Sequence, residues 1–375
     1  MRGPSVRPIV IAAGGTGGHF FPAEGLAATL IARGHRVVLM TDARSGGLNS
    51  AVFANRETHV LPGAGIAGRG LLRGAKAIAS LSAGVMRARS ILAELGAGAV
   101  VGFGGYPCVP PVLATSLLRH RPAVILHEQN AVLGRANRFL SGRADTLALS
   151  FAATQRVPAK TRTAVTGNPV RPAIAALADA GYIAPQAETG ARIRLLILGG
   201  SLGARVFSDV VPAALLALPD GLRGRLMVTQ QCRAEDLDRV RAAYAEAGIA
   251  AELAPFFGDV AARLVSAHLV IARAGASTVA ELAVAGRPSI LVPLPGAIDD
   301  HQTANARALA EANGAWVMPQ PGFTPAALAE RLTALLSDPA ALAGAAVGAR
   351  TQARPGAATL LAETVEALMQ QDAYS

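Results

Sequence analysis

Short runs of apolar residues alternate with longer stretches of helical periodicity along the chain. The short runs are rich in Val, Ile and Leu, which is typical of strands buried on both faces of a parallel sheet. Strands are predicted at residues 8–13, 36–41, 99–102, 123–127 and 163–166, and again at 194–198, 226–229, 269–272 and 289–292. The stretches between them predict helices, so the pattern as a whole indicates an α/β protein.

The pattern starts twice, which predicts two domains of ordinary size within the 375 residues. Each half opens with a strand, a glycine-rich loop and a helix. The first helix is predicted at 22–33, with Gly34 as its C-cap glycine. The predicted parts are an N-terminal domain at 1–172, a polar linker at 173–190, a C-terminal domain at 191–355, and a last helix within 356–375 that fits either domain.

Charge is divided unevenly between the two halves. Residues 1–172 contain 20 Lys and Arg against 6 Asp and Glu, a net charge of +14, whereas residues 173–375 carry −4. A basic domain is expected to face a nucleic acid or an anionic membrane surface. Only 4% of the residues are aromatic, and none interleave with Lys and Arg as a nucleic-acid stacking platform requires. The membrane surface is therefore the favoured partner.

The sequence predicts neither a membrane span nor a secretion signal. No apolar run reaches the roughly 20 residues that a spanning helix needs, and the N-terminus lacks the long apolar core of a cleavable signal. Cys108 and Cys232 lie far apart without a metal-ligand spacing and are expected to be reduced thiols. The expected compartment is therefore the cytoplasm.

Three glycine-rich loops directly follow predicted strands, at residues 14–19, 102–107 and 199–203. Glycine lets backbone N–H groups approach a phosphate or a sugar closely, and a helix N-terminus adds partial positive charge there. Loops of this kind lie at the carboxyl ends of parallel strands, where α/β proteins bind ligands. Three such loops, split across two domains, predict a ligand held between the domains.

Two other nucleotide-binding motifs fit the loops poorly. A dinucleotide fingerprint in the first loop could use Asp42 as its ribose-binding acid, but Phe20 takes the place of the third glycine. The lysine of a phosphate-binding P-loop is missing from all three loops. A metal-binding Asp-x-Asp motif is also missing, since Asp299 and Asp300 are adjacent. Neither an essential metal nor a cofactor is therefore expected.

Seven motifs in order carry a family resemblance: GGTGGH at 14–19 with Pro22 and Ala23, GFGGYP at 102–107, HEQN at 127–130, GNPVR at 167–171, GGSLG at 199–203, residues 273–281, and DHQTANA at 300–306. Over residues 8–310 the chain resembles the MurG family, the peptidoglycan N-acetylglucosaminyltransferases that convert lipid I to lipid II. The resemblance implies the GT-B fold, in which two Rossmann-like parallel-sheet domains face an interdomain cleft. It also implies that the last helix crosses back to the N-terminal domain.

The resemblance implies an activity, partners and a location. The activity is inverting transfer of GlcNAc from UDP-GlcNAc to the C4 hydroxyl of MurNAc in lipid I. The N-terminal domain would bind the acceptor and the C-terminal domain the donor. The implied location is the cytoplasmic face of the bacterial plasma membrane, as a peripheral protein. Implied partners are UDP-GlcNAc, lipid I, the anionic membrane surface and other cell-wall synthesis proteins. Another GT-B enzyme with a different acceptor is the closest alternative, and a nicotinamide-binding or non-catalytic α/β protein is a further one.

Inverting transfer needs a base for the acceptor hydroxyl. His19 is the first candidate, because histidine titrates near pH ~6.5 and this one stands at a loop–helix junction; a structural role is the alternative. Glu128 is the rival, as base or as the group that orients His19. Asn130 either binds sugar hydroxyls, which the resemblance favours, or caps the following turn. The remaining acceptor-side candidates are Thr16, Gly17 and Gly18 of the first loop and Gly104, Gly105 and Tyr106 of the second.

The donor-side candidates lie mainly in the second half of the chain. Arg171 suits the diphosphate, with an interdomain salt bridge as the alternative. Ser201 and the N–H groups around it are expected to hold the pyrophosphate. Residues 278–281 fit a capping box, in which Glu281 would reach back to the helix start; the resemblance instead assigns Glu281 to the ribose hydroxyls.

The other donor-side residues rest on the resemblance. Phe257 matches a position that contacts uracil largely through its backbone. Ala276, Ser277, Thr278, Val279 and Ala280 lie close to the nucleotide. Gln302 is expected to reach the GlcNAc hydroxyls beside His301, with a helix-cap role as the alternative.

Residues 69–95 combine apolar and basic side chains in one predicted helix. The apolar members are Leu71, Leu72, Ile78, Leu81, Val85 and Met86, and the basic members are Arg69, Arg73, Lys76, Arg87 and Arg89. This combination suits an anionic bilayer surface near the acceptor, while an amphipathic core helix with a solvated basic face is the alternative. The charge of the N-terminal half favours the membrane.

Overall fold

The computed structural model describes residues 7–14, 17–43, 50–62, 71–186, 190–200 and 203–373, with the backbone alone for 71–76, 372 and 373. The chain divides into two compact units. The N-terminal unit comprises Met1–Arg171 together with Gly356–Ser375, and the C-terminal unit comprises Pro172–Pro355. The N-terminal unit is therefore discontinuous in sequence.

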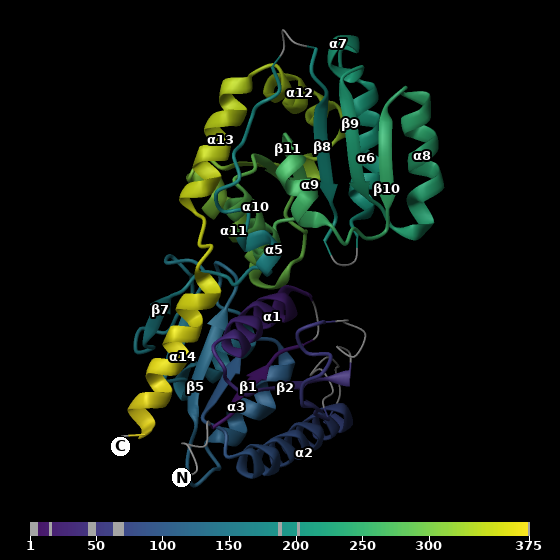
Figure 1. The fold of residues 1–375 in the computed structure, drawn as a ribbon. Coiled ribbons are helices and arrows are strands. Elements are labelled where there is room, and N and C mark those ends of the chain that lie inside the picture. Colours follow the sequence, from purple (N-terminus) through teal and green to yellow (C-terminus); the bar gives the residue numbers. More distant parts are fainter. Residues whose placement is uncertain are drawn as a thin grey trace. The chain divides into compact units, whose positions relative to one another are not determined.

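The N-terminal unit is built on a seven-stranded sheet in the order β3-β2-β1-β4-β5-β6-β7 (Figure 1). All of its pairings are parallel. The strands are β1 (Ile9–Ala12), β2 (Val37–Thr41), β3 (Thr58–Val60), β4 (Ala99–Gly102), β5 (Ala123–Glu128), β6 (Thr146–Leu149) and β7 (Thr163–Val165). The chain runs outward from β1 to β3 and returns on the other side of β1 as β4, so the strand order reverses between β1 and β4.

Helices cover both faces of this sheet: α1 (Gly17–Ala32), α2 (Leu71–Leu95), α3 (Val109–Thr115), α4 (Arg135–Leu140) and α14 (Ala357–Ala373). Successive residues of a strand point to opposite faces. Ile9 and Ile11 of β1 accordingly share a core with α1 and α14, whereas Val10 and Ala12 share another with α2, α3 and α4. The last helix, α14, packs against α1 (Figure 1).

The C-terminal unit has a six-stranded sheet in the order β10-β9-β8-β11-β12-β13, with parallel pairing throughout. The strands are β8 (Ile193–Leu198), β9 (Leu226–Gln231), β10 (Ala250–Ala254), β11 (Leu269–Ala272), β12 (Ser289–Leu291) and β13 (Ala315–Val317). Here the order reverses between β8 and β11. Two parallel-sheet units with helices between their strands confirm the predicted fold class.

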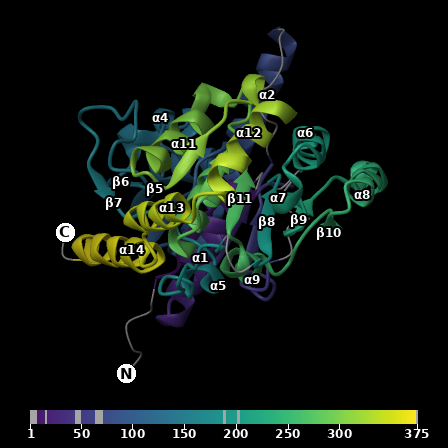
Figure 2. The same ribbon diagram turned by 90° about the horizontal axis from the view of Figure 1, so that it is seen from above.

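The helices of the C-terminal unit are α5 (Pro172–Ala175), α6 (Arg205–Leu216), α7 (Asp220–Arg223), α8 (Leu237–Glu246), α9 (Val260–Ser266), α10 (Ala276–Ala285), α11 (His301–Glu311), α12 (Pro325–Leu336) and α13 (Pro339–Thr351). Helices α6 and α8 lie beside β8, β9 and β10 (Figure 2). Alternate residues of β8, such as Ile193, Leu195 and Ile197, pack into one core with α6, α8 and α12.

Most predicted strands appear within a residue or two of their expected bounds, but one helix start was wrong. Helix α1 begins at Gly17 rather than at Pro22, which lies inside it. Proline lacks an N–H and commonly marks a first turn, and here it is accommodated one turn further on. Gly34 has φ +86°, as a C-cap glycine requires, and Cys108 and Cys232 are free and buried.

The chain entering the C-terminal unit is anchored by two arginines and a tyrosine. Arg287 is fully buried and donates to the carbonyl oxygen of Gly181 at 3.0 Å. Arg350 donates to the carbonyl oxygens of Ala178 and Ala180, and the Tyr182 hydroxyl donates to His268 O at 2.8 Å. Part of the stretch predicted as a linker is thus fixed onto this unit.

Among the described residues, no single helix is both long and apolar enough to cross a bilayer. Helices α12 and α13 reach that length and apolar composition only as a pair, and they are bent by 94° relative to each other.

Candidate functional site

Each unit has one place where its strand order reverses, and the candidate residues gather there. In the N-terminal unit Ala12 of β1 pairs with Gly102 of β4, and in the C-terminal unit Leu198 of β8 pairs with Ala272 of β11. The loops that follow these residues diverge to opposite sides of each sheet. Open α/β sheets bind their ligands at this point, beyond the carboxyl ends of the strands.

In the N-terminal unit the imidazole of His19 lies against the second glycine loop. Gly104 and Gly105 have φ +80° and +68°, a left-handed conformation that favours glycine. A Cβ built on either residue would lie 3.4 Å from a carbon of the His19 ring. The two glycines therefore let the loop backbone approach the ring and leave no side chain beside it.

His19 is also held by buried side chains at the carboxyl end of β5. Its Nδ1 lies 3.0 Å from Oε1 of Gln129. Nε2 of Gln129 lies 3.0 Å from Phe103 O, 3.0 Å from Nδ1 of His127 and 3.2 Å from His127 O. Nε2 of His127 lies 3.0 Å from Gly167 O. Burial lowers the pKa of His127 to about 4, so this ring is neutral at physiological pH.

Glu128 is buried and its carboxylate is engaged by four donors. Oε1 accepts from the backbone N and from Nδ2 of Asn130, both at 3.0 Å. Oε2 accepts from Gly134 N and from Nδ2 of Asn137, both at 2.9 Å. Both carboxylate oxygens are thus occupied by donors from the segment that follows β5. The geometry suits Glu128 to orient Asn130 and its loop.

The other acceptor-side candidates lie on the same two loops. Gly17 is buried at the start of α1 and Gly18 is exposed, while Thr16 lies outside the described residues. The Tyr106 hydroxyl is buried and has no hydrogen-bond partner among the described residues, and burial raises the pKa of this phenol. The Arg171 guanidinium stacks over the Phe21 ring of α1 at 5.4 Å.

In the C-terminal unit Gln231, at the end of β9, holds the glycine loop. Its Oε1 accepts from Gly199 N at 3.1 Å, and its Nε2 donates to Gly200 O at 3.0 Å and to Pro255 O at 3.1 Å. A Cβ on Gly199 would lie 2.4 Å from Ala204 N, so this turn is open only to glycine. Ser201, the predicted pyrophosphate ligand, lies outside the described residues.

The N-terminus of α10 faces the same edge of the sheet. Gly275 is its N-cap, in an extended conformation with φ −63° and ψ 144°, and makes no side-chain cap. Thr278 is the third residue of α10, so the predicted capping box at 278–281 is wrong: the helix begins two residues earlier. The Ser277 hydroxyl is buried without a hydrogen-bond partner among the described residues. Glu281 lies on the second turn.

Ala276, Val279 and Ala280 complete the first turns of α10, with Ala276 and Val279 buried. Asn305 of α11 donates to Ala274 O at 3.1 Å and so fixes the loop before this helix. Arg273, directly after β11, donates to Val292 O at 3.1 Å and to Oε1 of Gln320 at 2.6 Å. Burial lowers the pKa of its guanidinium. Arg273 thus ties together the carboxyl ends of β11 and β12.

The remaining donor-side candidates are Phe257 and Gln302. Phe257 is 5% exposed, and its ring lies under the Arg263 guanidinium at 4.0 Å. The Phe257 ring is thus covered, whereas Phe256 is 71% exposed. Oε1 of Gln302 accepts from Leu294 N at 2.9 Å, which leaves its amide NH₂ for a ligand. His301 donates from Nδ1 to Ile298 O at 2.8 Å, a contact within its own turn.

Gln129, Asn137 and Gln231 organise these two sites and were not among the predicted residues. The available signal was their position, because Gln129 and Gln231 stand at or directly after the end of a buried strand in a parallel sheet. Among the described residues, no group of three or more His, Cys, Asp and Glu side chains has metal-binding geometry.

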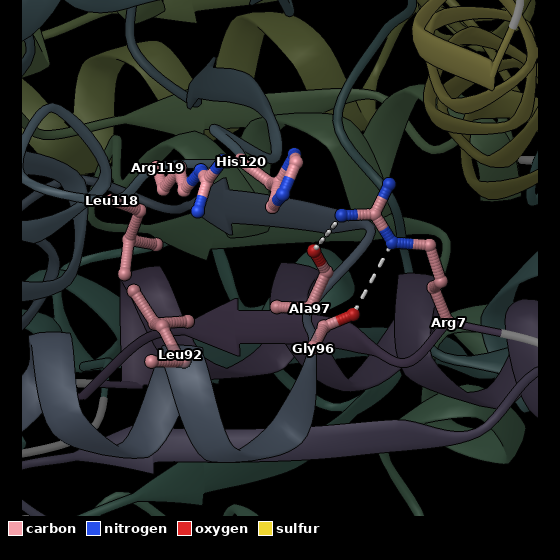
Figure 3. A pocket seen from close by; sticks show the side chains of 8 residues that line it. Arg7, Leu92, Gly96, Ala97, Leu118, Arg119 and His120 are labelled. Carbon is pink, nitrogen blue, oxygen red and sulfur yellow. Dashed lines mark hydrogen bonds between the residues drawn. The ribbon is translucent and has the colours of Figure 1, made fainter.

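A separate cavity of about 490 Å³ lies elsewhere on the N-terminal unit. It is lined by Arg7, Leu92, Ala93, Gly96, Ala97, Leu118, Arg119 and His120, and Arg7 donates to the carbonyl oxygens of Gly96 and Ala97 (Figure 3). These segments precede β1, β4 and β5. The cavity therefore lies at the amino ends of the strands, at the opposite edge of the sheet from His19.

Comparison with known proteins covers both units. Residues 9–149 match the glycosyltransferase family 28 N-terminal domain, and residues 194–361 match the glycosyltransferase family 28 C-terminal domain. A relative from Granulibacter bethesdensis is 64% identical over 97% of this chain and 94% of its own. A second relative, from Acidiphilium cryptum, is 56% identical over 97% of this chain and 98% of its own. Both are named UDP-N-acetylglucosamine–N-acetylmuramyl-(pentapeptide) pyrophosphoryl-undecaprenol N-acetylglucosamine transferase.

Solved structures agree with this grouping. The crystal structure of Acinetobacter baumannii MurG has a TM-score of 0.77 and 31% identity, covering 96% of this chain and 98% of its own. The glycosyltransferase of kitacinnamycin has a TM-score of 0.68 over 97% and 100% of the two chains. At 18% identity, the second likeness concerns the fold alone.

Proposed function

The chain belongs to glycosyltransferase family 28, and from this premise we propose that it transfers N-acetylglucosamine from UDP-N-acetylglucosamine to the C4 hydroxyl of the N-acetylmuramyl unit of lipid I. The product is lipid II, the disaccharide precursor of peptidoglycan. The observation that carries the proposal is the 64% identity to a transferase named for this reaction, over 97% of the chain and hence over both units.

The acceptor side is assigned to the N-terminal unit. The C4 oxygen attacks C1 of GlcNAc while the bond from C1 to UDP breaks, with inversion at C1. The hydroxyl proton passes to His19, and the electron pair of the broken bond leaves with UDP. Asn130, held by Glu128, is proposed to bind sugar hydroxyls. Gly104, Gly105 and Tyr106 form the acceptor loop, with Thr16, Gly17 and Gly18 beside His19.

The donor side is assigned to the C-terminal unit. The uncapped N–H groups at Ala276–Thr278 and the Gly199 loop with Ser201 are proposed to bind the diphosphate, because helix N-termini favour anions. Arg171, the last residue of the first segment of the N-terminal unit, is the proposed cation for the same group. Glu281 is assigned to the ribose hydroxyls, the Phe257 backbone to uracil and Gln302 to GlcNAc. This arrangement stabilises the negative charge that UDP gains as it leaves.

We propose in addition that the protein attaches peripherally to the cytoplasmic face of the plasma membrane through α2. Ala88, Ile91 and Leu92 of this helix pack into the core, but Ile78 is 68% and Met86 is 54% exposed. Arg87 and Arg89 are exposed on the same helix. Apolar side chains flanked by cations favour an anionic bilayer surface. Arg69 lies outside the described residues, as do the side chains of Leu71, Leu72, Arg73 and Lys76.

The transferase activity is tested by UDP release from UDP-GlcNAc with and without a lipid I analogue, in EDTA. We expect acceptor-dependent release and a GlcNAc-β-1,4-MurNAc product. His19→Ala is expected to lower kcat by roughly 10²- to 10⁴-fold with little change in KM for UDP-GlcNAc, whereas His120→Ala, an exposed histidine, keeps full activity. Binding of UDP-GlcNAc without release in the presence of lipid I would leave a family 28 enzyme with another acceptor.

A second variant separates the two candidate bases. If Glu128 only orients the Asn130 loop, Glu128→Gln lowers activity but keeps the fall in activity at acid pH that the wild type shows. If the fall in kcat at acid pH disappeared in Glu128→Gln and persisted in His19→Ala, the base would be Glu128 instead.

A further inference from the structure

His19, Gln129 and His127 form one chain of hydrogen bonds that ends on a backbone carbonyl. The contacts run from Nδ1 of His19 to Oε1 of Gln129, from Nε2 of Gln129 to Nδ1 of His127, and from Nε2 of His127 to Gly167 O, each at 3.0 Å. His127 is fully buried and Gln129 is 1% exposed, so water does not compete for the Gln129–His127 and His127–Gly167 bonds.

The direction of every bond in this chain is determined by its carbonyl oxygens, which can only accept. Because Gly167 O accepts, Nε2 of His127 carries the proton, and in the neutral ring Nδ1 is then an acceptor. Phe103 O and His127 O likewise face the Gln129 amide, so its NH₂ group points toward them and toward Nδ1 of His127. The amide oxygen of Gln129 is therefore the atom that faces His19, and Nδ1 of His19 must donate to it.

We propose that Gln129 is a positioning residue that fixes His19 in the tautomer with the proton on Nδ1, so that Nε2 presents its lone pair to the acceptor hydroxyl. The inference rests on the proposed function for the identity of that hydroxyl. A neutral imidazole has one donor and one acceptor nitrogen, and the opposite tautomer would direct an N–H at the substrate. His127 acts one step further away, since its own orientation sets the orientation of the Gln129 amide.

The titratable groups around these hydrogen bonds do not reverse their donor and acceptor directions at neutral pH. His127 stays neutral because burial lowers its pKa to about 4. Cys108, in the turn after the glycine loop, stays protonated because burial raises its pKa to about 12, and Tyr106 is held neutral in the same way. The carboxylate of Glu128 is engaged by Asn130, Gly134 and Asn137. Among the described residues, Gln129 is the one side chain that hydrogen-bonds to His19.

The first test determines the tautomer in the wild-type protein. With ¹⁵N-labelled histidine, the His19 signals are assigned by their absence from the spectrum of His19→Gln. In the neutral ring we expect Nδ1 to be protonated and Nε2 to be unprotonated. A His19 ring protonated mainly on Nε2 overturns the proposal. The measurement needs no turnover, so its failure is distinguishable from failure of the proposed transferase activity.

Two variants of Gln129 test the consequence for catalysis. Gln129→Met keeps the length but cannot hydrogen-bond, and we expect both His19 tautomers, a kcat lowered roughly 10- to 100-fold, and a KM for UDP-GlcNAc within about twofold. Gln129→Glu places a carboxylate beside His19 and stabilises its protonated form, so the acid limb of the pH–kcat profile moves up by about one pH unit. Gln352→Glu, at an exposed position, is the matched control and is expected to shift nothing. A Gln129→Glu profile that overlays the wild type contradicts the proposal, because a merely structural glutamine would lower activity without moving the limb.

Discussion

At the scale of single residues, the N-terminal unit keeps a neutral histidine in its core. His127 is fully buried, 5.2 Å from the Phe103 ring centroid, and the charged form is disfavoured by burial, which lowers its pKa to about 4. In the unfolded chain a histidine titrates near pH ~6.5. Between these two values the unfolded state binds more protons than the folded state, so stability rises with pH across this window.

This difference predicts an acid-sensitive N-terminal unit. The contribution of His127 is complete above pH ~6.5 and is lost as the pH falls toward 4, by about 3 kcal/mol. We expect thermal unfolding between pH 7.5 and 4.5 to show this loss in the wild type and a flatter dependence in His127→Gln, although the variant is less stable at pH 7.5. His120→Gln, on an exposed histidine, should keep the wild-type slope. Equal slopes in His127→Gln and the wild type would assign the effect to other groups.

The residues that could be predicted from the sequence are those whose chemistry is local. His19, Gly104 and Gly105 were recognisable as loop residues after buried strands, and the structure brings them together. The roles of Gln129 and Gln231 could not be predicted, because each depends on carbonyl oxygens and rings supplied by distant segments. The capping box at Thr278 was wrong for the converse reason: the local motif was present, but Gly275 had already begun the helix.

At the scale of elements, α2 divides its surface between the core and the outside. One side buries Ala88, Ile91 and Leu92, and the other exposes Ile78 and Met86 beside cations. A helix that packs one face on the core of a soluble protein rarely exposes several large apolar side chains on its other face, although single ones are common. The exposed pair is therefore the part of α2 that distinguishes membrane attachment from ordinary packing.

This feature predicts that membrane binding depends on two apolar side chains. We expect Ile78→Ser with Met86→Ser to lower sedimentation with anionic phospholipid vesicles by roughly tenfold, since each exposed side chain contributes about 1 kcal/mol of partial burial. Binding to zwitterionic vesicles should be weak for all proteins, because the cations then lose their partner. Ile183→Ser with Val347→Ser, two equally exposed apolar positions of the C-terminal unit, is the matched control. Equal loss in both double variants would contradict a specific role of α2.

The elements predicted best are the central strands. Strands β4 and β11 have the predicted bounds, because both of their faces are buried and each is therefore a short run of small and apolar residues. Strands β3, β6, β10 and β13 were missed. The residues of β3 and β10 are largely exposed and carry no such run, whereas the four residues of β6 are all buried and β13 has only three residues. These strands are defined by pairing with a neighbour, and pairing partners are not readable from a single segment.

At the scale of the whole molecule, the last helix belongs to the unit in which the chain began. Leu361, Ala362 and Val365 of α14 are fully buried in the core shared with α1 and β1. Around it, Arg33 pairs with Glu366 at 2.7 Å and His35 with the same carboxylate at 2.8 Å. Exposed pairs of this kind contribute little, so the buried apolar face holds the helix. The N-terminal unit is therefore incomplete without α14.

This arrangement predicts which half of the molecule each C-terminal helix stabilises. Leu361 on α14 and Leu342 on α13 are both fully buried leucines, but they belong to the N-terminal and C-terminal cores respectively. Each Leu→Ala change should cost about 2–5 kcal/mol. We expect Leu361→Ala to accelerate hydrogen exchange in peptides covering β1 and β4, and Leu342→Ala to do so in β8 and β11. If Leu361→Ala loosened β8 and β11 as much as β1 and β4, the chain would unfold as one cooperative body, and the division into two units would have no meaning for its stability.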